Sequence, residues 1–144
     1  MTTDTNKPNS IFWVIGITGL IWNLMGLDGY INQSYQTERF KSMYSEEQLE
    51  IILNLPPWVT AAFAVAVFSS VSACIFLLLK KKIAKTFFII GLLAALVQTT
   101  YNLFINPGRN MFGSIEYAML IMIPIISVFL FWYSKKCTDD GMLS

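Results

Sequence analysis

Four polar side chains that lie within long apolar stretches are the residues of this sequence best suited to chemistry. They are Asn23, Gln98, Asn102 and Glu116. Side-chain amides both donate and accept hydrogen bonds and a carboxylate accepts them, so this set suits the recognition of a small neutral polar solute. Amides in an apolar environment also bond across helix interfaces. The pattern therefore leaves two interpretations open, a ligand-binding site or contacts that hold helices together.

Residues suited to metal binding or acid–base catalysis are scarce. The chain has no histidine, which removes the commonest general base and the commonest transition-metal ligand. Cys74 and Cys137 are far apart in the sequence, and the topology predicted below places both toward the reducing cytoplasm. Met111, Met119 and Met122 are better explained as flexible packing than as thioether ligands. We therefore predict that the protein is not an enzyme and has no catalytic residues, no metal site, no cofactor and no disulfide.

The composition indicates a protein surrounded by lipid. Hydrophobic residues make up 55% of the 144 residues and charged residues 13%, whereas a soluble domain carries about a quarter charged residues. The net charge of +1 is not gathered into a basic patch on a polar surface, which argues against nucleic acid as a partner. The lipid bilayer is the expected surrounding of the chain.

Four apolar stretches are long enough to cross a bilayer, because a hydrocarbon core of about 30 Å needs about 20 apolar residues in a helix. We predict helices over residues 11–31, 58–79, 83–105 and 111–133. The last three are joined by short loops and are expected to be antiparallel neighbours. The predicted fold class is all-α, an integral membrane four-helix bundle in which residues 1–144 form a single membrane domain.

The positions of the lysines predict the orientation, because positively charged loops stay on the cytoplasmic side of the membrane. Lysines gather between the second and third spans and after the fourth span, at Lys80, Lys81, Lys82, Lys85, Lys135 and Lys136. We therefore expect this loop and both the N- and C-termini in the cytoplasm. Residues 32–57 are then expected on the outer side.

The polar segment 32–57 is expected to contain a short amphipathic helix. Ser45 and Gln48 have the spacing of a capping box, and Leu49, Ile52 and Leu53 follow at helical spacing. An amphipathic helix of this kind needs only the membrane interface to be stable. We favour a helix that rests on the outer membrane surface, with a lid over a pocket as the alternative.

Small residues at helical spacing mark the faces expected to pack. Gly19 and Gly26 share a face of the first span with Asn23, and a similar stripe in the third span includes Gln98. Counted from the cytoplasmic ends, Asn23 lies roughly 18 Å deep and Gln98 roughly 22 Å deep. We predict that the first and third spans pack together and that these two amides touch or share a neighbour. Asp28 lies on a different side of the first span and is not grouped with the site.

Three segments of the chain resemble the sequences of a known family. They are Ile-Trp-Asn-Leu-Met-Gly at 21–26, Pro-Trp-Val-Thr-Ala-Ala-Phe-Ala-Val-Ala-Val-Phe at 57–68 and Trp-Tyr-Ser-Lys-Lys at 132–136. Together they resemble a family of small, uncharacterised four-helix bacterial inner-membrane proteins whose members often carry the label sugar transporter. The resemblance covers the chain from about residue 11 to residue 136 and implies a multi-pass protein of the bacterial inner membrane. It implies no catalytic or binding residues.

Two kinds of function are open at this point. One is transport of a small, sugar-like solute, or an accessory role in such transport. Four helices enclose little space, so this function is expected to need a homodimer or a larger complex. The other is a non-transporting structural or regulatory component of a membrane complex, held by the small-residue faces. Any solute site is expected in the outer half of the bilayer, bounded by the first, third and fourth spans.

Overall fold

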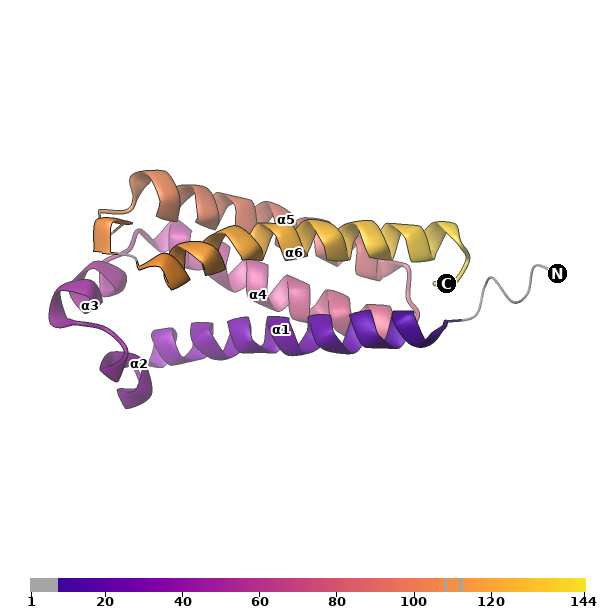
Figure 1. Cartoon of the computed structure of the whole chain (residues 1–144), viewed down its shortest axis with the longest axis horizontal. Coiled ribbons are helices and arrows are strands. Elements are labelled where there is room, and N and C mark those ends of the chain that lie inside the picture. Colours follow the sequence, from indigo (N-terminus) through magenta and orange to yellow (C-terminus); the bar gives the residue numbers. More distant parts are fainter. Residues whose placement is uncertain (1–7, 108, 112) are drawn as a thin grey trace.

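The computed structural model describes residues 8–107, 109–111 and 113–144. Four long helices form a bundle in which successive helices run in opposite directions (Figure 1). They are α1 (Ser10–Tyr35), α4 (Pro57–Leu78), α5 (Ile83–Thr100) and α6 (Ser114–Asp139). The chain described here contains no strand, so the predicted all-α class is confirmed.

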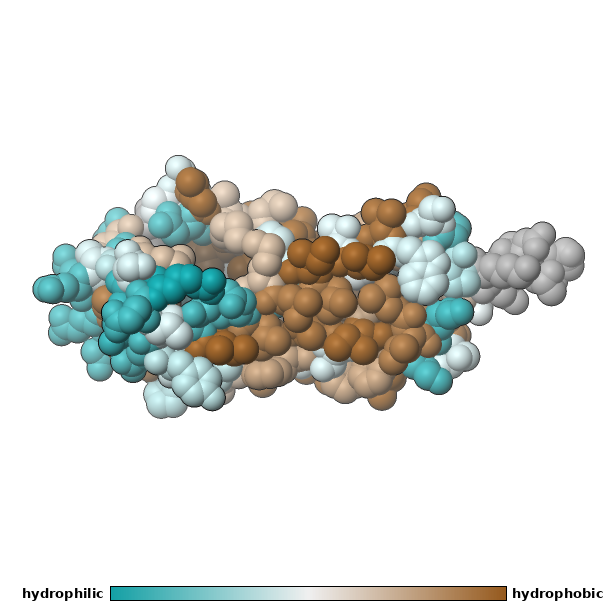
Figure 2. Space-filling model, turned by 90° about the horizontal axis from the view of Figure 1, so that it is seen from below, coloured by the Kyte–Doolittle hydropathy of each residue, from teal (hydrophilic) through white to brown (hydrophobic). Residues whose placement is uncertain are grey.

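Each long helix is sufficiently long and apolar to cross a membrane. Hydrophobic residues form a band along the molecule, between a strongly hydrophilic end and a smaller hydrophilic group at the opposite end (Figure 2). These features indicate a multi-pass membrane protein. The predicted bounds hold closely for α4 and for the third span, which includes α5 and runs from Ile83 to Ile105. By contrast, α1 continues to Tyr35 and α6 runs from Ser114 to Asp139.

Short elements occupy the end of the bundle opposite the start of α1 and the end of α6 (Figure 1). α2 (Glu38–Ser42) and α3 (Glu46–Leu53) connect α1 to α4. The third span continues beyond α5 as a π-helical turn, η2 (Tyr101–Ile105), followed by a short 3-10 turn, η3 (Arg109–Met111). This end of the molecule therefore combines several short segments that present polar side chains.

α4 is the central helix of the bundle, with extensive contacts to α1 and α5, while α5 also packs on α6. The expected packing of the first span on the third is therefore wrong, because α4 lies between them. The small residues of α1 face α4 instead: a Cβ added at Gly16 would lie 2.5 Å from Leu78 Cδ2, and one at Gly26 would lie 3.5 Å from Val67 Cγ1. The predicted antiparallel contacts of α4 with α5 and of α5 with α6 are confirmed.

The apolar core lies near the end of the bundle where α1 begins and α6 ends. Phe12, Leu77, Leu130 and Cys137 are among its fully or almost fully buried members. Cys74 also belongs to this core, and neither cysteine forms a disulfide. The helices pack closely at this end. They enclose space at the opposite end, beneath α2 and α3.

Candidate functional site

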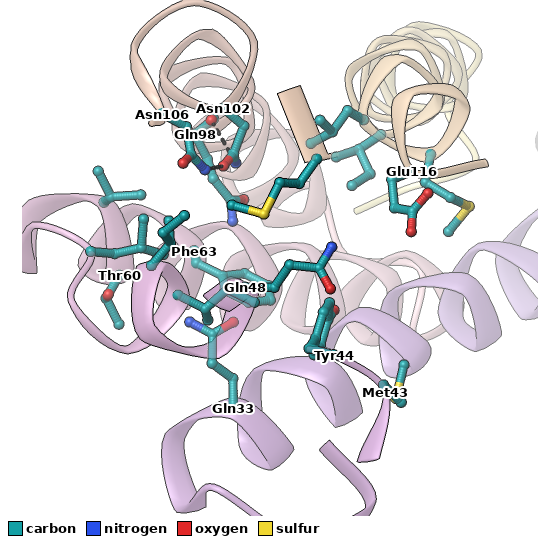
Figure 3. A pocket seen from close by; sticks show the side chains of 18 of the residues that line it. Gln33, Met43, Tyr44, Gln48, Thr60, Phe63, Gln98, Asn102, Asn106 and Glu116 are labelled. Carbon is teal, nitrogen blue, oxygen red and sulfur yellow. Dashed lines mark hydrogen bonds between the residues drawn. The ribbon is translucent and has the colours of Figure 1, made fainter. Parts of the chain in front are cut away.

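A cavity of about 500 Å³ lies at the end of the bundle that carries α3 (Figure 3). Pockets for small molecules commonly measure about 300–1,000 Å³. Its walls come from all four long helices, from α3 and from the segment that precedes α3. The polar or charged residues that line it are Gln33, Tyr44, Gln48, Thr60, Gln98, Asn102, Asn106 and Glu116.

Three of the four predicted site residues line this cavity, namely Gln98, Asn102 and Glu116. In Figure 3, Glu116 lies across the cavity from Gln98 and Asn102. Asn23 instead lines a second cavity, of about 190 Å³, whose wall also includes Gln98. The two amides therefore face a shared space although their helices are not neighbours.

The Asn23 side chain is engaged in a helix contact. Its Nδ2 donates to the backbone oxygen of Gly19 at 2.9 Å and to Cys74 Sγ at 3.3 Å. The second bond joins α1 to α4. Asn23 is therefore better explained as a contact between helices than as a ligand-binding group.

Gln98 presents the opposite case. Among the described residues, its half-buried side-chain amide has no hydrogen-bond partner, although it lies in the wall common to both cavities. An amide offers two donor hydrogens and an acceptor oxygen, and a polar group in apolar surroundings is unfavourable until it is paired. The polar atoms of Gln98 therefore remain available to a ligand.

Asn102 is held in place by residues of its own segment. Its Nδ2 donates to the backbone oxygen of Gln98 at 3.0 Å, and its Oδ1 accepts from Asn106 Nδ2 at 2.9 Å. The η2 turn ends with the Asn106 backbone N–H donating to the oxygen of Tyr101 at 2.8 Å. Wide turns of this kind occur frequently at functional sites, and here two asparagines of the turn region line one cavity.

Glu116 lies in the first turn of α6, where a carboxylate interacts favourably with the helix dipole. It is the one charged side chain among the described residues that line the cavity. Arg109 is close enough to Glu116 in the sequence to be expected as its partner, but the Arg109 side chain lies outside the part of the chain that the structure describes.

Tyr44 adds a hydroxyl group to the same cavity. Burial raises the pKa of Tyr44 above its ordinary value, and the nearby Glu116 carboxylate raises this pKa further. Tyr44 is therefore neutral at physiological pH and retains its O–H group as a donor. A donor from the segment before α3 thus complements the acceptor carboxylate of α6.

α3 covers one side of the cavity through Gln48, Ile51 and Ile52. The predicted capping box is confirmed: the Gln48 backbone N–H donates to Ser45 Oγ at 3.2 Å, and the Ser45 N–H donates to Gln48 Oε1 at 3.0 Å. The favoured prediction was a helix resting on the membrane surface. Three lining residues in one short helix support the lid alternative.

Asp28 lies outside both cavities, as its helical position predicted. It forms an ion pair with Arg39 of α2, and both side chains are largely exposed. The sequence analysis did not identify Arg39 as its partner, because the two residues are brought together by the turn between α1 and α2. The pair ties α2 to the end of α1.

Several lining residues were missed by sequence reasoning. Gln33 falls beyond the predicted end of the first span, yet α1 extends to Tyr35 and carries it to the cavity. The site was also expected to be bounded by the first, third and fourth spans only. That boundary is incomplete, because α4 contributes Val59, Thr60 and Phe63. Thr60 was detectable as a polar residue in an apolar stretch, but one hydroxyl is a weak signal.

The lining as a whole suits binding more than catalysis. Five amide side chains, a phenol, a hydroxyl and a carboxylate can pair with the hydroxyl groups of a neutral molecule, and apolar side chains such as Val59 and Phe63 complete the wall. Among the described residues no group of three or more Cys, Asp or Glu side chains is arranged to hold a metal ion. The arrangement can orient a small polar molecule through hydrogen bonds.

Comparison of the chain with protein-family models, curated proteins and solved structures finds no match in any of the three. The resemblance to small inner-membrane proteins stays a prediction.

Proposed function

We propose that this chain is a multi-pass protein of the bacterial inner membrane that binds a small neutral polar solute, such as a sugar, in the cavity beneath α3. The bound solute would be carried across the membrane by the protein or by a larger complex to which it belongs. The observation that carries this proposal is the Gln98 amide, which lines the cavity without a hydrogen-bond partner among the described residues.

The other polar groups support a neutral solute over an anionic one. The described lining supplies amides and hydroxyls, which bind either donors or acceptors, and the single carboxylate of Glu116. An anion would be repelled by that carboxylate, whereas hydroxyl groups can donate to it. A sugar or another polyol meets these requirements.

The position of α3 supports a role in the movement of solute. A short helix that covers a cavity can control access to it, and α3 joins the bundle through Leu55, Pro56 and the segment before Ser45. Four helices enclose little space for a complete pathway across the bilayer, so we propose that transport requires a second copy or a larger membrane complex.

Solute uptake by the purified protein in vesicles tests this proposal. We expect radiolabelled neutral sugars or polyols to enter faster than in vesicles without protein. Gln98→Leu should lower the rate by about fivefold to tenfold, because a lost hydrogen bond costs about 1 kcal/mol or slightly more. Thr100→Val is the matched control, since Thr100 is an exposed residue of the same helix that lines neither cavity.

Two results would contradict the proposal in different ways. Uptake equal to that of protein-free vesicles for every solute tested would contradict transport by this chain or by an assembly of its own copies, and would leave only a role within a larger membrane complex. Uptake that is unchanged in Gln98→Leu would show that the cavity beneath α3 is not the site.

A further inference from the structure

The two cavities adjoin along a common wall. Phe63, Gln98, Met119 and Ile123 line both of them. The larger cavity lies beneath α3, and the smaller one continues between α1, α4, α5 and α6 toward the middle of the bundle. Gln98 therefore stands at the junction of two adjoining spaces.

The smaller cavity offers a ligand mostly apolar contacts. Two of its polar residues are already engaged, because Asn23 bonds to Gly19 and Cys74, and Ser127 Oγ donates to the backbone oxygen of Ile123 at 2.9 Å. Its other polar lining residues are Ser70 and Gln98, and the apolar ones include Trp22, Met25, Val67 and Ala95. The polar cavity is thus continued by a space suited to hydrocarbon.

Exposed residues of α1 and α6 lie in the wall of this apolar space, and from them we infer that it opens between these two helices. The two helices approach at Gly19, where an added Cβ would lie 3.1 Å from Leu130 Cδ2, but they do not contact each other extensively. Met25 of α1 and Met119 of α6 line the smaller cavity, and their side chains are 62% and 43% exposed. Both lie within spans, so the opening between them faces the acyl chains of the bilayer.

We propose that the ligand is an amphiphile with an uncharged, hydroxyl-rich head group and a single alkyl chain, which enters from the bilayer between α1 and α6. The head group would occupy the cavity beneath α3 and the first part of the chain would occupy the smaller cavity. This proposal rests on the proposed function, because the head group uses the same cavity, and it names the class of the solute.

The dimensions fit such a ligand. A protein cavity of about 150 Å³ holds a benzene molecule, so the smaller cavity, at about 190 Å³, has room for a chain segment of several carbons. The rest of the chain can leave between Met25 and Met119 and remain among the lipids. A head group that carries a phosphate fits poorly, because its negative charge would meet the Glu116 carboxylate.

Photo-crosslinking of the full-length protein in lipid vesicles tests the inference. The probe is octyl glucoside with a diazirine in its alkyl chain, and the control probe is octanol with the same diazirine. We expect the glucoside probe to label residues 22–26 and 119–127 selectively, with loss of labelling when unmodified octyl glucoside is added. The octanol probe should label the lipid-facing surface without this preference.

Filling the smaller cavity should abolish the selective labelling. Gly26→Leu places a side chain in it from α1, and Ser127→Leu does so from α6, so the test does not depend on one variant that fails to fold. Gly29→Leu is the matched control, because a Cβ at Gly29 meets nothing within 4 Å and Gly29 lines neither cavity. Selective labelling that persists in both cavity-filling variants would overturn the inference.

Binding of free glucose separates this inference from the function on which it rests. If glucose binds in a Gln98-dependent manner and the glucoside probe labels no cavity residue, the solute is a free sugar and the amphiphile proposal fails alone. If glucose does not bind and the two probes give the same labelling pattern, both proposals fail.

Discussion

At the scale of single residues, close helix contacts determine where glycine is required. A Cβ at Gly91 would lie 2.5 Å from Ser70 Oγ and 3.4 Å from the backbone oxygen of Ala66, at the contact of α5 with α4. We expect Gly91→Leu to lower the free energy of unfolding by about 1–3 kcal/mol or more, because overpacking forces the helices apart. Thermal unfolding in detergent measures this. Gly29→Leu, in open space, should be neutral, and equal losses in both variants would contradict the packing described.

A second residue-scale prediction concerns Tyr44 at high pH. Its pKa is raised in the folded state by burial and by Glu116. The folded protein therefore retains this proton at a pH where the unfolded chain has lost it. Stability should be fully present below about pH 10 and should decrease as the pH rises above it.

Tyr44→Phe should make this decrease smaller, because the phenol that titrates is removed. The measurement is the free energy of unfolding of both proteins on either side of pH 10. Tyr35→Phe is the control, since Tyr35 is 79% exposed. The same pH dependence in wild type and Tyr44→Phe would show that the phenol is not buried in the folded protein.

The sequence identified the polar residues that lie within the spans, but it did not predict the contacts that each of them makes. Asn23 and Gln98 look alike in the sequence, since each is an amide on a small-residue stripe. In the structure, Asn23 bonds to Gly19 and Cys74, while the Gln98 side chain has no partner among the described residues. The difference depends on which helices are neighbours, and spacing along one helix carries no information on that point.

At the scale of elements, the capping box of α3 gives a way to test its role as a cover. Ser45→Ala removes the cap and should cost the helix about 1 kcal/mol, which allows α3 to open more often. We expect a thiol introduced by Gln98→Cys to react with a water-soluble maleimide about fivefold faster when Ser45→Ala is also present than when Ser45 is retained. Ser42→Ala is the control, because Ser42 Oγ bonds to Arg39 O outside α3. An unchanged rate with Ser45→Ala would contradict the lid.

The positions of the four spans were predictable because apolar length is set by the thickness of the bilayer. The ends of α1 and α6 and the helix that neighbours α1 were not. The third span ends at Ile105 as predicted, since Pro107 cannot continue it. The glycine stripe of α1 was correctly identified as a contact face, but it packs on α4 and, at Gly19, also approaches Leu130 of α6, and it does not pack on α5. A stripe of small residues permits a close approach without specifying the helix that approaches. The cover provided by α3 also depends on tertiary structure, because its sequence suits a membrane surface equally well.

At the scale of the whole molecule, α1 begins and α6 ends at the same end of the bundle as the loop that contains Lys81 (Figure 1). The lysines at this end predict that it faces the cytoplasm. A cysteine introduced by Lys41→Cys in α2 should then react with a membrane-impermeant thiol reagent added to intact cells, and one introduced by Lys82→Cys should not. Labelling of position 82 but not of position 41 would reverse the orientation.

Equilibrium binding tests the central claim, a solute site beneath α3, most directly. Isothermal titration of the protein in lipid nanodiscs with uncharged sugars and polyols should find at least one ligand. Gln98→Leu should weaken its binding by about fivefold or more, and Glu116→Gln should weaken it as well. Thr100→Val and Glu47→Gln, which change exposed residues outside the cavity, should leave the affinity unchanged. Affinity that is the same in Gln98→Leu as in the wild type, or the absence of any ligand in such a panel, would contradict the account.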